Sequence, residues 1–285
     1  DHGADAVGRD GAESTVLMTA ANRGHIAVVN ILLEGGALAS VNYLNRDGYS
    51  ALMYAATKGH NQIVTKLLTA GADAIARSTG DSNSSTALMM ATESGHIAVV
   101  NILLERGALP SVNYVNSDGY SALMYAAREG HNQVVSRLLI AGAYVHARNP
   151  MYFDNTALHY AARRGHLGVV NILLEAGADI HARTAAVIDN EEPNEVALHI
   201  ATMGGHLDVV NRLLNHPNAV VDVRDHGQRT ALIIAAGGNN VAVANTLLER
   251  GADINAQSIS GYTPLMRIAE SGNSRMLDTF YYRNN

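Results

Sequence analysis

The chain has 285 residues, a net charge of −6 and no cysteine, with 47% hydrophobic and 16% charged residues. This composition is typical of a folded chain, and it excludes a disulfide framework and cysteine-ligated zinc. The acidic balance without a basic stripe argues against nucleic acid as a partner.

Two further properties bear on location. No apolar run of the sequence approaches the ~20 residues that span a bilayer, so membrane insertion is not expected. The lack of cysteine fits a reducing compartment, so a cytoplasmic location is expected.

A nine-residue phrase, typified by Leu-Met-Tyr-Ala-Ala-Thr-Lys-Gly-His at 52–60, recurs along the chain. Strong copies begin at residues 17, 52, 88, 123, 158 and 198, and altered copies begin at 232 and 265. Such a period indicates a repeat array, in which each unit buries its apolar face against its neighbours. We therefore expect one domain of about eight repeats over residues 9–283, with 281–285 as a C-terminal tail. Residues 3–11 have the form of the end of a repeat, so a fragment of a longer array is expected.

A second period lies within the first half. Residues 15–77 and 86–148 form a duplicated two-repeat block with a constant offset of 71 residues, and the segment 24–34 recurs unchanged at 95–105. Near-identical copies have not diverged toward different contacts. We therefore expect binding specificity in repeats five to eight, whose sequences are individual.

Repeat five shows how one unit is expected to fold. Thr156 is placed to cap a first helix that runs to about Arg164, and Gly165 ends it. His166 begins a second helix that closes at Gly177. The apolar residues of the second helix fall at helical spacing and predict one buried stripe: Val169, Val170, Leu173 and Leu174. Helices of about ten residues are unstable alone, so stability must come from stacking.

The phrases that carry a family resemblance in repeat five are Thr156-Ala157-Leu158-His159, Ala161-Ala162, Gly165-His166, Val169-Val170, Leu173-Leu174 and Gly177-Ala178-Asp179. Together they resemble the ankyrin repeat, and the resemblance covers practically the whole chain. It implies an all-α solenoid of helix-turn-helix pairs joined by β-hairpin-like loops. The departures are lengthened loops, Asn239-Asn240 in place of Gly-His in copy seven, and altered apolar residues in copy eight.

Thirteen histidines raise the question of a metal site or acid–base chemistry. Six occupy one repeat position (His25, His60, His96, His131, His166 and His206), and His159 and His199 occupy another. The resemblance implies structural hydrogen bonds between repeats at both positions. The sequence has no HExxH phrase, no nucleophile elbow and no phosphate-binding loop. We therefore expect no metal, no cofactor, no small-molecule substrate and no catalysis.

The resemblance implies that a protein partner binds the concave face, at hairpin tips and at the exposed side of the first helices. The candidates on those positions are Tyr120, Arg128, Tyr152, Phe153, Arg163, Arg164, Glu192 and Glu195. Tyrosine and arginine most often carry interface energy. Residues 152, 153, 163 and 164 are expected to form a cationic–aromatic pocket, with Arg128 one repeat away. The alternative is that carboxylates of the next hairpin neutralise the arginines: Asp189, Glu191, Glu192 and Glu195.

Two loop features remain open. The insertion at 184–195 either carries function or lengthened neutrally, because loop closure costs little per added residue. Asn42, Asn113 and Asn255 resemble the ankyrin asparagine that asparaginyl hydroxylases modify, and Asn255 fits best. The alternative for these asparagines is a bond to their own turn.

The sequence therefore predicts a monomeric, non-catalytic protein-interaction scaffold. One alternative is the targeting or regulatory region of a larger enzyme, or of a bacterial effector that acts in the host cytosol. Another is a structural spacer without a specific partner.

Overall fold

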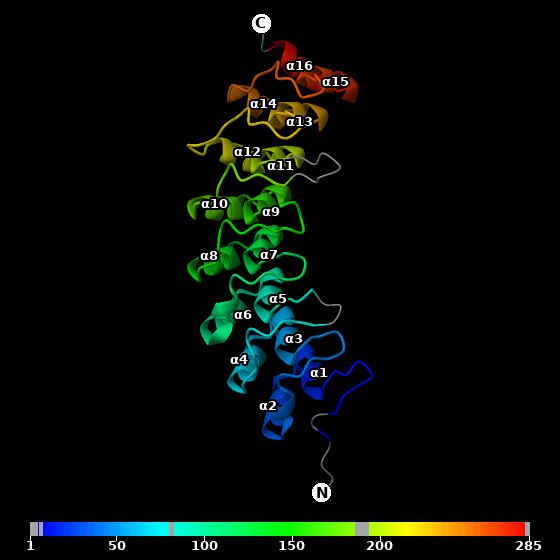
Figure 1. Ribbon diagram of the computed structural model, residues 1–285, viewed down its shortest axis with the longest axis vertical. Helices are drawn as coiled ribbons and strands as arrows, with labels where there is room; N and C mark the ends of the chain where they lie inside the picture. The colour runs from blue at the N-terminus through cyan, green and yellow to red at the C-terminus, as the bar shows by residue number, and fades with distance from the viewer. Residues whose placement is uncertain (1–4, 6–7, 80–82, 186–193, 283–285) are drawn as a thin grey trace. The chain divides into compact units, whose positions relative to one another are not determined.

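The computed structural model describes residues 5, 8–79, 83–185 and 194–282. The chain divides into two compact units, residues 1–144 and 145–285, which are described separately. Across the described residues there are sixteen α-helices in pairs, each pair followed by a loop (Figure 1).

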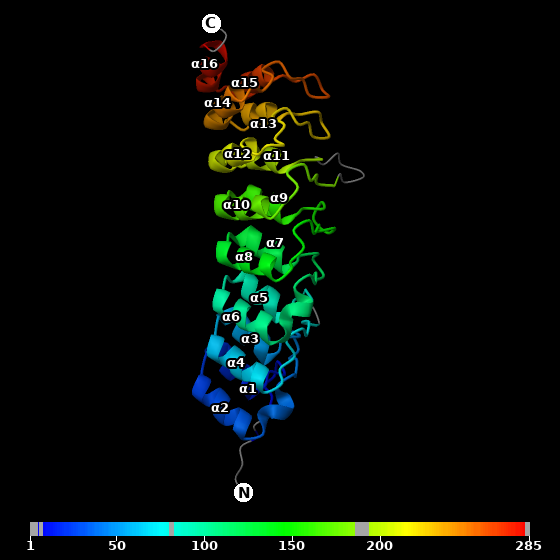
Figure 2. The same ribbon diagram turned by 90° about the vertical axis from the view of Figure 1, so that its left-hand side faces the viewer.

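The first unit holds four helix pairs. Its first helices are α1 (Val16–Arg23), α3 (Ala51–Lys58), α5 (Ala87–Glu93) and α7 (Ala122–Glu129). Its second helices are α2 (Ile26–Glu34), α4 (Asn61–Thr69), α6 (Ile97–Leu103) and α8 (Asn132–Ile140). Short helical turns follow two of them: η1 (Ala37–Ser40), η2 (Leu104–Ala108) and η3 (Leu109–Ser111). Successive first helices contact one another, and so do successive second helices, which gives two layers (Figure 1). The loops of this unit project to one side of the helices (Figure 2).

The second unit repeats this arrangement. Its first helices are α9 (Ala157–Arg164), α11 (Ala197–Met203), α13 (Ala231–Gly237) and α15 (Pro264–Ser271). Its second helices are α10 (Leu167–Glu175), α12 (Leu207–Leu214), α14 (Val241–Glu249) and α16 (Ser274–Tyr282). The same two layers of neighbouring helices form.

Local chemistry sets the ends of the first helices. In six of them a Ser or Thr hydroxyl accepts the backbone N–H three residues on, at 3.2–3.5 Å. In repeat five Thr156 caps α9 as predicted, in a capping box with His159, and its hydroxyl also lies 3.2 Å from Nδ1 of His159. Gly165 ends α9 with φ 73°, a left-handed conformation that glycine adopts without strain.

The core lies between the layers and consists of alanine and aliphatic side chains. The predicted stripe of α10 is confirmed, since Val169, Val170, Leu173 and Leu174 are all buried. Ala161 and Ala162 have no exposed surface, which lets neighbouring first helices approach closely. The loops are hairpin-like, with single antiparallel bridges such as Val115–Ser121 and Asn149–Asn155.

Candidate partner-binding surface

One set of histidines bonds successive repeats together. Nε2 of His60, His96, His131 and His206 lies 3.0–3.3 Å from a backbone carbonyl of the preceding repeat. The predicted structural role is confirmed for these four. In copy seven, Asn240 replaces the histidine, and its Nδ2 donates to the Thr202 carbonyl at 2.8 Å. The altered copy therefore keeps the bond.

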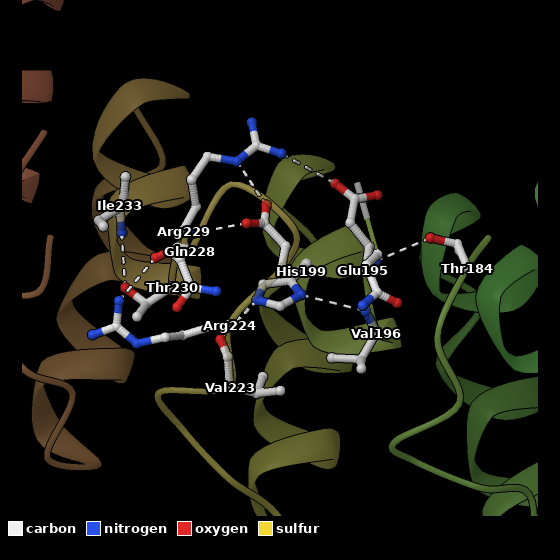
Figure 3. Close-up of polar contacts among 12 residues, drawn as sticks. Thr184, Glu195, Val196, His199, Val223, Arg224, Gln228, Arg229, Thr230 and Ile233 are labelled. Atoms are coloured by element: carbon white, nitrogen blue, oxygen red, sulfur yellow. Dashed lines mark hydrogen bonds and ion pairs between the residues drawn. The ribbon is translucent and has the colours of Figure 1, made fainter. Parts of the chain in front are cut away.

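His159 and His199 also serve the fold. Nδ1 of each accepts the N–H of the residue before its helix, Thr156 at 3.0 Å and Val196 at 3.3 Å, and Nε2 lies 2.9 Å from a carbonyl (Figure 3 shows His199). Burial lowers the pKa of His159 to about 4, while its bond to Ala182 opposes that change. Burial likewise lowers the pKa of His199. Both rings are therefore neutral at physiological pH.

Methionine takes the place of this histidine in the first unit. The sulfur atoms of Met18, Met53 and Met124 lie 3.3–3.5 Å from the N–H of the residue that caps their helix. Sulfur is a weak acceptor, so this bond to the first turn is weaker than the one to histidine.

Within the part of the chain that the structure describes, two kinds of site are absent. No three His, Asp or Glu side chains gather where they could hold a metal ion. No helix there is long and apolar enough to cross a membrane.

The candidates in the first unit, Tyr120 and Arg128, contact each other, and Arg128 is only partly exposed. The ring of Tyr120 stacks on Tyr125, with centroids 4.9 Å apart, and the Arg128 guanidinium lies 5.0 Å from each centroid. Arg128 also contacts Glu93 and Glu129 at 2.7 Å. Tyr120 is only 7% exposed, so its predicted place on a binding surface is wrong. The cluster links α5 to α7 instead.

Glu195 is also predicted to lie on the binding surface, and this prediction is wrong. It is 3% exposed, its N–H donates to the Thr184 hydroxyl at 2.9 Å, and its carboxylate lies 3.8 Å from Arg229 (Figure 3). Arg229 in turn contacts Asp225 at 2.6 Å. A buried, charge-paired Glu195 links the loops of neighbouring repeats and is not open to a partner. Glu192 and residues 186–193 of the insertion lie outside the described residues.

The hairpin of repeat five is exposed as predicted. Tyr152 and Phe153 are 45% and 42% exposed, and the neighbouring Met151, which sequence reasoning missed, is 65% exposed. The turn closes through the Asn155 N–H on the Tyr152 carbonyl at 3.0 Å. Phe153 and Asp154 both have φ 54°, in the left-handed region. That conformation costs a non-glycine residue about 1–2 kcal/mol. Strain of this kind concentrates at functional sites.

Arg163 and Arg164 are exposed at the end of α9, as predicted. Neither makes an ion pair with a carboxylate among the described residues. Of the carboxylates that the alternative assigned to them, Glu195 contacts Arg229, and the other three fall in the undescribed 186–193 segment. In the described part of the chain their charge is therefore not neutralised.

The three asparagines of the loops divide into two kinds. Asn42 and Asn113 each donate to a glycine carbonyl at 3.0 Å and accept a backbone N–H at 2.8 Å, both in the following repeat. Asn255 is exposed, and the described residues give its side chain no hydrogen bond. Its amide is therefore accessible, whereas the other two are held.

Comparison with known protein families agrees with this architecture. A family described as ankyrin repeats (3 copies) matches residues 2–78, 74–149, 110–184 and 186–258. The chain therefore belongs to the ankyrin-repeat family. No curated protein matches it.

Proposed function

We propose that this chain is a non-catalytic protein-interaction scaffold of the cytoplasm, and that it binds its partner as a monomer through the hairpin of repeat five. Ankyrin repeats are generally protein-interaction modules. The observation that carries the proposal is the run of exposed side chains Met151, Tyr152 and Phe153 on a left-handed turn. Aromatic side chains at such a tip bury a large area at low entropic cost.

The hairpin is held in place before any partner arrives. The Phe153 carbonyl accepts the Ala185 N–H of the next loop at 2.7 Å. Asn149, fully buried at the base of the hairpin, donates to the Tyr160 hydroxyl at 3.0 Å. A preformed tip loses little conformational entropy on binding, so more of the contact energy appears as affinity.

Arg163 and Arg164 supply the charge on the first helix of the same repeat. Because the described residues leave both without a carboxylate partner, an acidic group on the partner gains a charge-assisted hydrogen bond without displacing an internal one. Partner contact is therefore assigned to residues 151–153, 163 and 164.

Affinity capture from eukaryotic cytosol tests the proposal, with the intact chain as bait and the variant Y152A/F153A/R163A/R164A beside it. A matched control, Y144A/L109A/R106A/R250A, removes exposed side chains of similar kind elsewhere. A prey retained by the parent and the control, and lost by the first variant, supports the proposed surface. A prey that all three retain, or no specific prey, contradicts it.

We also propose Asn255 as a site for asparaginyl hydroxylation, because its amide is exposed and unbonded among the described residues. Incubation with an asparaginyl hydroxylase should add one oxygen atom to the peptide that contains Asn255. Asn42, whose amide is bonded on both sides, should stay unmodified. Equal modification of both, or none at Asn255, contradicts the assignment.

A further inference from the structure

Three arginines of the second unit form a ladder along successive loops. Arg148, Arg183 and Arg224 stand at the same position, at the ends of the segments 143–148, 178–183 and 219–224. Nη1 of each donates to the carbonyl of the residue at this position in the next repeat, namely Arg183 at 2.7 Å, Arg224 at 2.9 Å and Gln257 at 2.8 Å. The three guanidinium groups are therefore fixed in register, one per repeat.

The charge of this arginine ladder is not neutralised within the described residues. None of the three lies within 4.0 Å of a carboxylate there, and Nη1 of each also lies near a backbone carbonyl at its own hairpin. Arg229, a few residues from Arg224, shows the contrast, since two carboxylates hold it (Figure 3). An arginine has five N–H donors, and the carbonyls occupy only Nη1. Nε and Nη2 donate no hydrogen bond within the described residues, and Arg148 is exposed while Arg183 and Arg224 are partly exposed.

In the first unit, an aromatic ring covers the arginine at the corresponding position. Arg77 ends the segment 72–77, so it holds the same position, and its Nη1 donates to the Val115 carbonyl at 2.9 Å. Its guanidinium, however, lies 4.6 Å from the ring centroid of Tyr114. The arginine ladder of the second unit has no such ring over it among the described residues.

We infer that the arginine ladder binds an extended acidic segment of the protein partner, with a carboxylate at every third residue. Neighbouring helices pack ~8–10 Å apart, which sets the spacing of the guanidinium groups. A polyproline II segment has three residues per turn and a rise of ~3.1 Å, so every third side chain returns to one face after ~9 Å. Each carboxylate then meets one guanidinium edge, the pairing with the best geometry.

The ladder also continues into the hairpin of repeat five. Nη1 of Arg148 lies 3.4 Å from the Asp154 carbonyl, directly after Phe153. One end of the acidic segment therefore reaches the exposed aromatic tip. The inference rests on the proposed function in that the ligand is a protein segment, and it adds the chemistry of that segment.

Two peptides test the charge and the register together. The probe is a fluorescein-labelled, end-capped (Glu-Pro-Pro)₃ peptide, measured by fluorescence anisotropy at low and high salt. The matched peptide has the same composition with its three Glu adjacent, Glu₃Pro₆. We expect the spaced peptide to bind the intact chain at least about fivefold more tightly, and its binding to weaken with salt. Equal affinities, or no binding of the spaced peptide, overturn the inference.

Protein variants locate the site. R148Q/R183Q/R224Q should weaken binding of the spaced peptide at least about tenfold, because three charge-assisted contacts are lost. The control R23Q/R106Q/R250Q changes the net charge equally at exposed arginines elsewhere and should change affinity less than about twofold. If the triple variant does not fold, R148Q alone should still weaken binding, because Arg148 is exposed. Equal loss in ladder and control variants overturns the inference.

The experiments distinguish a failure of the proposed hairpin site from a failure of the arginine ladder inference. If the ladder variant binds the spaced peptide as the parent does, while the captured prey is still lost by the hairpin variant, only the ladder inference fails. If the peptide binds the ladder and no prey depends on residues 151–153, the proposed hairpin site fails.

Discussion

At the scale of single residues, the chain uses two different side chains for one task. His159 and His199 bond the start of their helices and a carbonyl of the following loop, while Met18, Met53 and Met124 reach only the start of the helix. Methionine does not titrate, whereas a buried histidine must stay neutral. The second unit therefore carries an acid sensitivity that this position of the first unit lacks.

His159 should make stability depend on pH. Its pKa is about 4 in the folded chain, against an ordinary value of 6.5. Between these values the unfolded state binds the extra proton, so the contribution is fully present above 6.5 and lost as pH falls to about 4. The total loss is on the order of 3 kcal/mol.

The variant H159M, which places at this position the side chain that Met53 supplies in repeat two, should remove this dependence. Urea unfolding of parent and variant at about pH 7.5 and about pH 4.5 measures it, and the parent should lose more stability on acidification than the variant. Because the other histidines are present in both chains, their contributions cancel in the comparison. An equal loss in both would show that the His159 ring is not held neutral by burial.

At the scale of the helix pair, glycine and histidine act together. Gly59 ends α3 with φ 74°, and a Cβ placed on it would lie 2.7 Å from the ring of His96 in the next repeat. Gly71 has a similar φ of 89°, with nothing within 4 Å of its Cβ position. An alanine substitution at each of the two glycines therefore separates the free-energy cost of backbone strain from the cost of disturbing the contact between repeats.

Gly59→Ala should therefore destabilise the chain more than Gly71→Ala. The shared left-handed strain costs about 1–2 kcal/mol in each variant. At Gly59 the displaced His96 ring also loses its bond to the Thr57 carbonyl, at a further cost of about 1 kcal/mol or more. Thermal or urea unfolding of the two variants tests this, and equal losses would mean that His96 moves aside freely.

Most of the helix pairs follow from the sequence, because capping residue, glycine and apolar stripe recur in fixed order. The end of α9 at Arg164 and the buried stripe of α10 needed no tertiary information. The burial of loop residues could not be predicted in this way, because the loop lengths differ from repeat to repeat. Glu195 follows the longest insertion, and its burial against Arg229 depends on how that loop meets the next one. No local sequence pattern predicts such a contact between two loops.

The same dependence on tertiary contacts explains why the predicted exposure of Tyr120 is wrong. In the duplicated block the offset of 71 aligns Tyr120 with Tyr49 and Arg128 with Thr57. Tyr49 is partly exposed and Tyr120 is buried, because an arginine covers only the second copy. The sequence offered one signal for the arginine ladder, an arginine at the end of corresponding loop segments, but its in-register bonds are visible only in the structure.

At the scale of the whole molecule, some arginines contact a carboxylate of the chain and others do not. The net charge of −6 gives no hint of a cationic site. Yet several arginines in the described part of the second unit have no carboxylate within 4.0 Å, and they include the ladder residues 148, 183 and 224 together with 163 and 164. Three of them, with the aromatic tip of residues 151–153, come from the segment 148–164. This concentration is why binding is assigned to repeat five and its neighbours.

Site-specific photo-crosslinking tests that assignment most directly. A photoreactive phenylalanine analogue is placed at Phe153, and in a second chain at Ile140, which is 80% exposed at the end of α8. Each chain is irradiated with the captured prey. The proposed surface predicts a crosslinked product from position 153 and none from position 140. A product from position 140 alone, or equal products from both, would contradict it.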